Sequence, residues 1–256
     1  MSVILKTSQI CKFFGGVKAV NCVDMEVVKG EVFGIIGPNG AGKSTFFNII
    51  SGLYKPTSGD AWFDGADLKN KHPETIARLG MARTFQNIRL FSNMTVTENI
   101  KIGFHIRTKS NMIDAIFHTK RYKEEERMKE QLTQELLEQV GLSEYASMLA
   151  GNLSYGTQRK VEIARALAIN PKILLLDEPA AGMNPTETES LMHFIKDLNN
   201  QGYTIVVIEH DMKFIMNLCD RILVLDHGNK IAEGTPEQIK VNPEVIKAYF
   251  GSKTVV

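Results

Sequence analysis

One glycine-rich stretch between two apolar runs constrains this chain more than any other part of the sequence. It reads Gly37-Pro38-Asn39-Gly40-Ala41-Gly42-Lys43-Ser44-Thr45. The apolar run 32–36 before it predicts a buried strand, and the run 46–50 after it predicts the start of a helix. A strand, a glycine-rich turn and a helix in this order are typical of a P-loop, whose backbone N–H groups surround phosphate oxygens. We therefore predict a nucleotide phosphate site at this turn.

The residue types at the end of this loop define the expected chemistry. Lys43 is expected to reach the β- and γ-phosphates of the nucleotide, and the Ser44 hydroxyl is expected to bind Mg²⁺. The Lys43 ammonium and the Mg²⁺ on Ser44 would neutralise the negative charge on the phosphate groups during phosphoryl transfer.

Composition excludes several classes of protein. A hydrophobic content of 43% over 256 residues excludes disorder, and a net charge of +1 offers no footprint for nucleic acid. We expect no signal peptide and no membrane span, because no apolar run approaches ~18 residues. The three cysteines, Cys11, Cys22 and Cys219, match no metal-ligand spacing and are odd in number. They favour reduced thiols in a cytosolic protein.

The order of the predicted elements indicates an α/β fold with two additions. Residues 3–10, 20–28 and the pair Trp62-Phe63 predict an antiparallel β layer. Residues 88–150 change to a charged, helical pattern, in which Thr95 to Glu98 resembles a capping box. The run 120–140 predicts an amphipathic helix with Met128, Leu132, Leu136 and Val140 on its packed face. Beyond this insert, short apolar runs at 173–176, 204–208 and 222–225 predict buried parallel strands.

Acidic and histidine side chains follow two of these strands. Asp177 and Glu178 follow the run 173–176, and His210 follows the run 204–208. The carboxyl ends of parallel strands meet at one sheet edge, so we expect these residues beside the P-loop. Asp177 is then expected to hold Mg²⁺ through its water shell, Glu178 to activate the attacking water, and His210 to face the γ-phosphate.

Other residues have no assignable role from local rules alone. Gln86 would be a solvated loop residue, and Phe14 would be a core residue by burial statistics. Ser154 would be a helix N-cap, and Gly156 would be a turn glycine.

Taken together, six motifs in order resemble the ATP-binding subunit of ABC transporters, and the resemblance covers essentially the whole chain. The motifs are residues 37–45, Gln86, 153–158, 173–178, 181–184 and His210. The resemblance implies a RecA-like P-loop NTPase core with an antiparallel β subdomain and a helical subdomain at about 88–165. The whole of 1–256 would then form one ATP-binding domain.

The resemblance also implies roles for the residues that local rules left open. Two subunits would close face to face, so that Ser154 and Gly156 contact the γ-phosphate bound to the partner. Gln86 would sense Mg²⁺, His210 would act as the switch histidine, and Phe14 would stack on adenine. Membrane permease subunits would dock near 85–91, with a solute-binding protein acting indirectly. The chain would lie at the cytoplasmic face of the inner membrane.

Several segments resemble one subfamily, the importer ATPases for branched-chain amino acids of the LivG type. These segments are 152–165, 180–185, 83–87 and the ending 233–251. Tyr155, Thr157 and Asn184 depart from the general family pattern. Urea or amide importer and lipopolysaccharide exporter ATPases share much of this pattern and stay open as alternatives. A soluble ABC protein acting on ribosomes or DNA usually has two cassettes or a long coiled-coil insertion, whereas this chain has one cassette and a short insert. A further alternative is a regulatory switch that binds a nucleotide without hydrolysing it, and the presence of Glu178 and His210 argues against that alternative.

Overall fold

The computed structural model describes residues 2–107, 114 and 116–250, so Gly251 of the expected C-terminal motif lies outside the described residues. The chain divides into two compact units. The first, called here the sheet unit, comprises 1–86, 172–182 and 195–256. The second, the helical unit, comprises 87–171 and 183–194.

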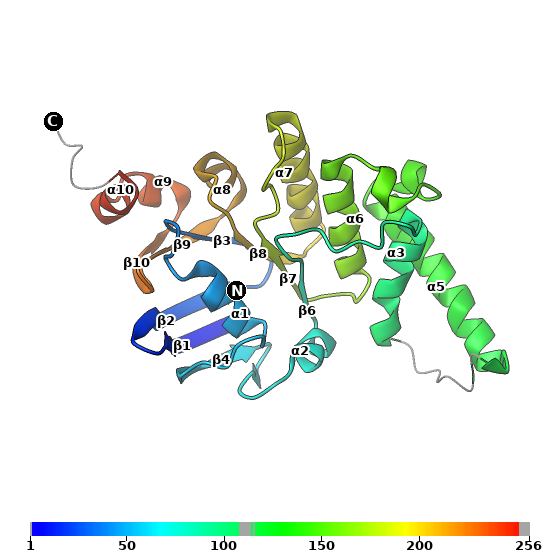
Figure 1. The fold of residues 1–256 in the computed structure, drawn as a ribbon, viewed down its shortest axis with the longest axis horizontal. Coiled ribbons are helices and arrows are strands. Elements are labelled where there is room, and N and C mark those ends of the chain that lie inside the picture. Colours follow the sequence, from blue (N-terminus) through cyan, green and yellow to red (C-terminus); the bar gives the residue numbers. More distant parts are fainter. Residues whose placement is uncertain (1, 108–113, 115, 251–256) are drawn as a thin grey trace. The chain divides into compact units, whose positions relative to one another are not determined.

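Two sheets build the sheet unit (Figure 1). The antiparallel sheet has the order β2-β1-β4-β5, formed by β1 (Val3–Phe14), β2 (Val17–Val28), β4 (Ser58–Phe63) and β5 (Ala66–Asp67). Gly15 allows the tight turn between β1 and β2 through a φ of 56°. This sheet agrees with the β layer that the sequence predicts.

The second sheet has the order β10-β9-β3-β8-β7-β6. Its strands are β3 (Val32–Ile36), β6 (Met81–Arg83), β7 (Ile173–Asp177), β8 (Thr204–Ile208), β9 (Arg221–Asp226) and β10 (Asn229–Gly234). All pairs from β9 to β6 are parallel, and only β10 pairs antiparallel. The carboxyl ends of β3, β7, β8 and β9 therefore meet at one edge, as expected for an α/β fold that binds a ligand.

The hydrophobic core lies between these two sheets and encloses helix α1 (Lys43–Ile50). Alternate residues of the parallel strands, such as Phe33 and Ile35, face α1, because successive side chains in a strand point to opposite faces. Phe46 and Phe47 of α1 are fully buried in this cluster. Burial of each such ring contributes about 2 kcal/mol, so the core fixes the helix that follows the P-loop.

Short helices complete the sheet unit: α2 (Pro73–Leu79), α8 (Met212–Leu218), α9 (Pro236–Lys240) and α10 (Pro243–Phe250). Pro73 starts α2 and Gly80 ends it with a φ of 108°, a start and stop typical of helices. Helices α9 and α10 pack beside β10, as Figure 1 shows. The hairpin between β9 and β10 turns at His227 and Gly228.

The helical unit contains α3 (Val96–Gly103), α5 (Lys120–Gln139) and α6 (Tyr155–Leu167), with short 3-10 segments at 104–107, 143–145 and 150–152. The predicted capping box is confirmed: the Thr95 hydroxyl accepts from the Glu98 N–H, and the Glu98 carboxylate accepts from the Thr95 N–H. Helix α7 (Pro185–Asn200) begins in this unit and ends in the sheet unit.

The predicted packed face of α5 is partly wrong. Met128 is 56% exposed, whereas Lys129, Thr133, Leu136 and Leu137 are buried. A strict four-residue step drifts around a helix of 3.6 residues per turn, so Met128 rotates away from the face that Leu136 occupies. Lys129 tolerates this burial because its ammonium lies 2.7 Å from the Glu126 carboxylate.

Candidate functional site

The P-loop leaves β3, whose five residues are all buried, and runs into α1. Two of its glycines are required by contact with neighbouring backbone. A Cβ at Gly37 would collide with the Leu225 carbonyl oxygen, and a Cβ at Gly42 would collide with the Ala19 carbonyl oxygen. Gly42 also has a φ of 98°, a conformation that L side chains rarely adopt. The loop is therefore held against β9 on one side and β2 on the other.

Lys43 begins α1 and folds its side chain back over the loop. Its Nζ donates to the Gly37 carbonyl at 2.7 Å and to the Pro38 carbonyl at 3.0 Å. Burial lowers the pKa of Lys43, and the negative charge of Glu178 opposes this shift. Both direct hydrogen bonds of this ammonium go to neutral carbonyls, so it gains free energy when an anion arrives, and the loop is prepared for phosphate.

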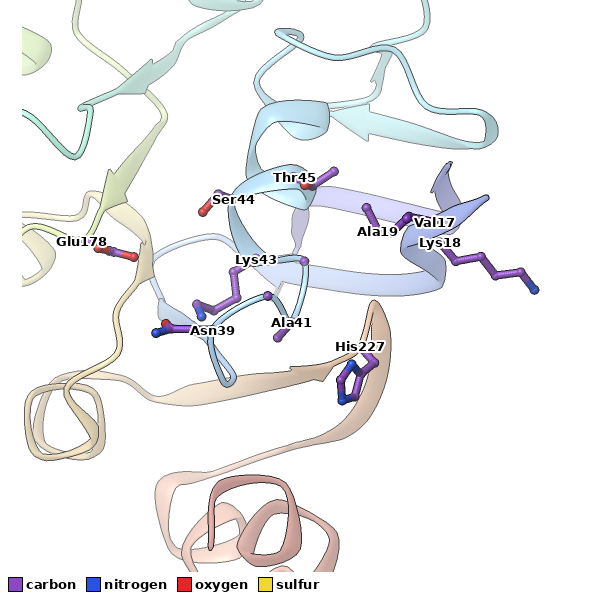
Figure 2. A pocket seen from close by; sticks show the side chains of 12 residues that line it. Val17, Lys18, Ala19, Asn39, Ala41, Lys43, Ser44, Thr45, Glu178 and His227 are labelled. Carbon is purple, nitrogen blue, oxygen red and sulfur yellow. The ribbon is translucent and has the colours of Figure 1, made fainter. Parts of the chain in front are cut away.

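The loop lines a pocket of about 350 Å³. Figure 2 shows Lys43 and Ser44 on the P-loop side and Glu178 reaching toward them from the end of β7. The start of β2 and the β9–β10 turn close the other end. The lining residues are Val17, Lys18, Ala19, Asn39, Gly40, Ala41, Gly42, Lys43, Ser44, Thr45, Glu178 and His227.

The two acidic residues after β7 have different partners. The Asp177 carboxylate accepts from the Arg83 guanidinium at 2.7 Å, with both side chains 10% exposed. Glu178 adopts a φ of 45° and accepts from Gln86 Nε2 at 2.7 Å. The sheet thus brings Asp177 and Glu178 together, as the strand pattern predicts, and places Gln86 beside Glu178, as the family resemblance implies.

A third carboxylate, which the sequence analysis missed, fixes this corner. Glu209 is fully buried and accepts from the Ala180 N–H at 2.7 Å and from the His210 N–H at 3.1 Å. Burial raises the pKa of Glu209, while these backbone hydrogen bonds oppose the shift. Glu209 ties the loop after β7 to the end of β8. An acid directly after an apolar strand and before His210 was its only signal.

His210 and Phe14 are among the predicted residues that lie outside the pocket lining. The His210 side chain is 60% exposed, and its Nδ1 lies 3.5 Å from the Glu209 carboxylate. The Phe14 ring is 47% exposed and meets Tyr54 edge-on, with ring centroids 5.8 Å apart. Phe14 is thus a surface residue, and the expectation from burial statistics that it is core is wrong. An exposed aromatic face is what stacking on a base requires.

Ser154 and Gly156 belong to the helical unit. The Ser154 hydroxyl caps α6 by accepting from the Thr157 N–H at 3.3 Å, as predicted. Gly156 is not a turn residue, because it lies in the first turn of α6, where a Cβ would stand 3.3 Å from the Glu187 side chain of α7, closer than ordinary van der Waals contact. Small size at this position keeps α6 and the start of α7 close.

Family models agree with this arrangement. The ABC transporter family model matches residues 20–181, well over half of the chain. The chain belongs to the ABC transporter ATP-binding family. A second model, described as branched-chain amino acid ATP-binding cassette transporter, matches residues 229–253. The protein is therefore an ABC ATPase, which confirms the predicted family and activity.

Individual relatives of this ABC ATPase match almost end to end. The high-affinity branched-chain amino acid transport ATP-binding protein BraF of Pseudomonas aeruginosa is 45% identical over 97% of this chain and 98% of its own. The corresponding LivG protein of Escherichia coli is 44% identical over the same shares.

Solved structures of cassettes confirm the P-loop NTPase fold. The ADP conformation of an ATP-binding cassette of an ABC transporter has a TM-score of 0.85 and 37% identity, covering 98% of this chain and all of that one. A dimeric post-hydrolysis cassette bound to ADP and phosphate has a TM-score of 0.74 and 28% identity, covering 91% and 99%. Cassettes of this family thus bind nucleotide and form dimers.

The donor set of the ABC ATPase pocket suits a magnesium ion held mostly by phosphate and water. Ser44 offers a hydroxyl in the pocket lining, and Asp177 keeps one carboxylate oxygen that Arg83 does not take. Within the described ranges no group of three or more His, Cys, Asp or Glu residues could hold a metal by itself. Mg²⁺ prefers such sparse oxygen sites because it retains water and binds through substrate phosphates.

Proposed function

We propose that this ABC ATPase is the ATP-hydrolysing subunit of a membrane importer for branched-chain amino acids. The observation that carries the proposal is the match of residues 229–253 to the branched-chain cassette model, added to 45% identity with BraF over nearly the full chain. A P-loop alone supports only nucleotide binding, whereas a C-terminal segment of this kind is specific to a subfamily.

The pocket residues divide the chemistry among them. The N–H groups from Asn39 to Thr45 and the Lys43 ammonium bind the phosphates, and Lys43 leaves the carbonyls of Gly37 and Pro38 to do so. Ser44, Gln86 and Asp177 would hold Mg²⁺. The ion would neutralise charge on the transferring phosphoryl group. Glu178 orients the attacking water and accepts its proton, with Gln86 holding its carboxylate.

His210 is proposed to contact the γ-phosphate from the end of β8. Its backbone is anchored by the buried Glu209 carboxylate, while its ring is free to reorient because the side chain is 60% exposed. Phe14 is proposed to stack on the adenine ring. Its exposed face and the edge-on support from Tyr54 suit that role.

A second ATP-binding subunit is proposed to complete each site through Ser154 and Gly156. The dimeric cassette with ADP and phosphate supports this arrangement by homology. Residues at about 88–165 are proposed to act as the helical subdomain that presents these two residues. Hydrogen bonds from the capped N-terminus of α6 would then meet the γ-phosphate bound to the partner.

The permease contact is proposed at the stretch that carries Phe85, Ile88, Leu90 and Phe91. The Phe91 ring is 51% exposed, yet its backbone is held in both directions by buried Asn99, at 2.9 Å and 3.0 Å. An exposed aromatic side chain on an anchored backbone suits an interface anchor. None of the described helices is both long and apolar enough to span a bilayer. As the ATPase subunit of an importer, the protein is proposed to lie at the cytoplasmic face of the inner membrane, held by its permease.

Uptake in a strain whose own cassette gene is deleted tests the function. Expression of this chain with its permeases should restore uptake of radiolabelled leucine, and Lys43→Ala should not. Uptake of urea or a short amide without leucine uptake would favour the alternative of a urea or amide importer. Lipopolysaccharide export defects without any uptake defect would favour the exporter.

Co-purification of the permease tests the docking surface separately. Phe91→Glu or Leu90→Glu should release the permease while ATP affinity stays unchanged, because both residues lie outside the phosphate-binding loop. Phe117→Glu is the matched control, since Phe117 is 75% exposed in the same unit. Retention of the permease by Phe91→Glu and Leu90→Glu would place the contact elsewhere.

A further inference from the structure

Two cysteines that are eleven residues apart meet across the β1–β2 hairpin. The Sγ atoms of Cys11 and Cys22 lie 3.1 Å apart, and the Cys22 backbone N–H donates to Cys11 Sγ at 3.1 Å. The sequence analysis expected reduced thiols and gave no reason to pair any two of them. The fold brings Cys11 and Cys22 together, whereas Cys219 lies buried beside Gly34 of β3.

An irregularity in the strand register creates this pairing. Ile10 pairs with Val23 and Lys12 pairs with Val20, so two β2 residues, Asn21 and Cys22, oppose Cys11 alone. Cys22 takes a φ of 51°, the left-handed conformation that a bulge imposes. Adjacent strands hold opposed Cα atoms about 4.5–5.5 Å apart, within the span that a disulfide bridges. The bulge also gives the backbone freedom to close the remaining gap.

The surroundings of the two sulfur atoms differ in a way that suits oxidation. Cys11 is buried, which by itself raises its pKa, but hydrogen bonds from Ser58 and from the Cys22 thiol and N–H outweigh burial and lower it. Cys22 is exposed, and its contact with Cys11 raises its pKa. The two sulfurs are therefore in hydrogen-bond contact at 3.1 Å, with the lower pKa on the buried Cys11 and the Cys22 sulfur reachable from solvent. Burial raises the pKa of Cys219, which keeps that thiol inert.

We propose that Cys11 and Cys22 form a redox modification site, at which a peroxide converts the two thiols to a disulfide and weakens ATP binding at the adjoining pocket. The Cys22 thiol passes its proton to the Cys11 thiolate across their contact while its sulfur attacks one peroxide oxygen; the O–O bond breaks, and the hydroxide that leaves takes that proton from Cys11 as water. Cys11 thiolate then attacks the resulting Cys22 sulfenic acid. The S–S bond forms, the S–O bond breaks, and a second water leaves. Two thiols and one hydrogen peroxide thus yield one disulfide and two waters.

A short chain of hydrogen bonds links this hairpin to the P-loop. The Asn21 N–H, next to Cys22, donates to the Gly228 carbonyl at 2.8 Å, and the Gly228 N–H donates to the Ala41 carbonyl at 3.0 Å. Ala19, three residues before Cys22, lines the nucleotide pocket beside Gly42. Disulfide formation draws the sulfurs from 3.1 Å to about 2.05 Å, so Cys22 and Asn21 must shift. That shift is transmitted to Ala41 through Gly228.

The disulfide is independent of the transport function, whereas its effect on ATP rests on the proposed nucleotide pocket. Purified full-length protein is treated with hydrogen peroxide, digested without reductant and analysed by mass spectrometry. ATP affinity is measured before treatment, after treatment and after dithiothreitol. We expect a Cys11–Cys22 linked peptide, a free Cys219 thiol, and about fivefold weaker ATP binding that dithiothreitol restores.

Cys22→Ser is the matched variant, because the exposed side chain can be replaced without disturbing the core. It should bind ATP as the reduced protein does and should lose the response to peroxide. Sulfinic acid at Cys22 with a free Cys11, or disulfides only between molecules, would overturn the modification site. A clean Cys11–Cys22 disulfide with unchanged ATP affinity would overturn the link to the pocket. The experiment does not measure leucine uptake, so failure of the import proposal can be distinguished from failure of the redox proposal.

Discussion

Arg83 and Asp177 form a nearly buried ion pair, with the guanidinium nitrogen 2.7 Å from the carboxylate oxygen. They lie on neighbouring parallel strands, β6 and β7, and Arg83 also donates to the Ser51 hydroxyl at the end of α1 at 2.5 Å. The Arg83 guanidinium further lies 5.0 Å from the centroid of the Phe47 ring. One cation therefore connects the proposed magnesium carboxylate to the helix that carries the P-loop.

Replacing Arg83 with Met should lower the free energy of unfolding by about 3 kcal/mol, because Asp177 would be left buried without a counter-charge. Urea unfolding measures the change. Arg78→Met is the matched control: Arg78 pairs with Glu74 at the surface, and its loss should cost less than about 1 kcal/mol. The double variant Arg83→Met with Asp177→Asn should recover stability relative to Arg83→Met alone. Equal effects of Arg83→Met and Arg78→Met would contradict this account.

Lys43→Ala should weaken ATP binding about a hundredfold. The charge-assisted hydrogen bonds to the β- and γ-phosphates are lost, and backbone N–H groups alone must hold the charge. Titration with a fluorescent ATP analogue measures the affinity. Lys29→Ala is the control, since Lys29 is an exposed lysine outside the pocket lining. Affinities within twofold of each other for the two variants would remove Lys43 from its proposed role.

Glu178→Gln should keep ATP affinity within about twofold and reduce turnover by about 10²–10⁴-fold. The amide oxygen of a glutamine can still accept the hydrogen bond from Gln86, but it cannot accept a proton from water. Phosphate release at saturating ATP measures turnover, and Glu189→Gln, an exposed acid of α7, serves as control. Near-normal turnover of Glu178→Gln would assign the base to another group.

Ser154→Ala should slow hydrolysis while leaving ATP affinity of the monomer unchanged, because the proposed contact is made to the partner's nucleotide. Mixing Ser154→Ala with Lys43→Ala should recover part of the lost activity, since one composite site of the mixed dimer carries neither change. The assay needs the natural second cassette if the subunit pairs with a different chain. Absence of recovery in both arrangements would count against shared sites.

Alkaline stability should depend on Tyr249 in α10. Burial raises the pKa of Tyr249 from 10.0 to about 12, against a smaller opposing effect of the Gly37 backbone. The folded state thus holds the phenol proton more tightly than the unfolded state, so this contribution is present below pH 10 and is lost as pH rises toward 12.

The melting temperature of Tyr249→Phe should therefore fall less steeply between pH 10 and 11.5 than that of the unsubstituted protein. At pH 7 the two should differ by less than about 1 kcal/mol, because the buried hydroxyl makes no well-formed hydrogen bond and its interaction with the Gly37 backbone is weak. Tyr54→Phe, at a 42% exposed position, is the control and should follow the unsubstituted protein. Parallel pH profiles for Tyr249→Phe and the unsubstituted protein would contradict the assignment.

Local patterns in the chain were sufficient for the elements and for the P-loop. The buried runs at 32–36, 173–177 and 204–208 are strands because continuous apolar residues need cover on both faces, which a parallel sheet provides. Thr95 caps α3 and Ser154 caps α6 through atoms three residues away. Such features depend only on near neighbours, so they can be predicted without knowledge of the fold.

Strand order and register decided the rest. Arg83 meets Asp177 because β6 pairs with β7 across 94 residues, and His227 reaches the pocket because β9 lies beside β3. Cys11 meets Cys22 because a bulge shifts the β1–β2 register between Ile10 and Lys12. The sequence by itself determined the phosphate-binding loop, the strand and helix periods and the family. Only the tertiary structure decided which distant side chains meet in a hydrogen bond, an ion pair or a pocket, because those contacts depend on how strands pair over long separations.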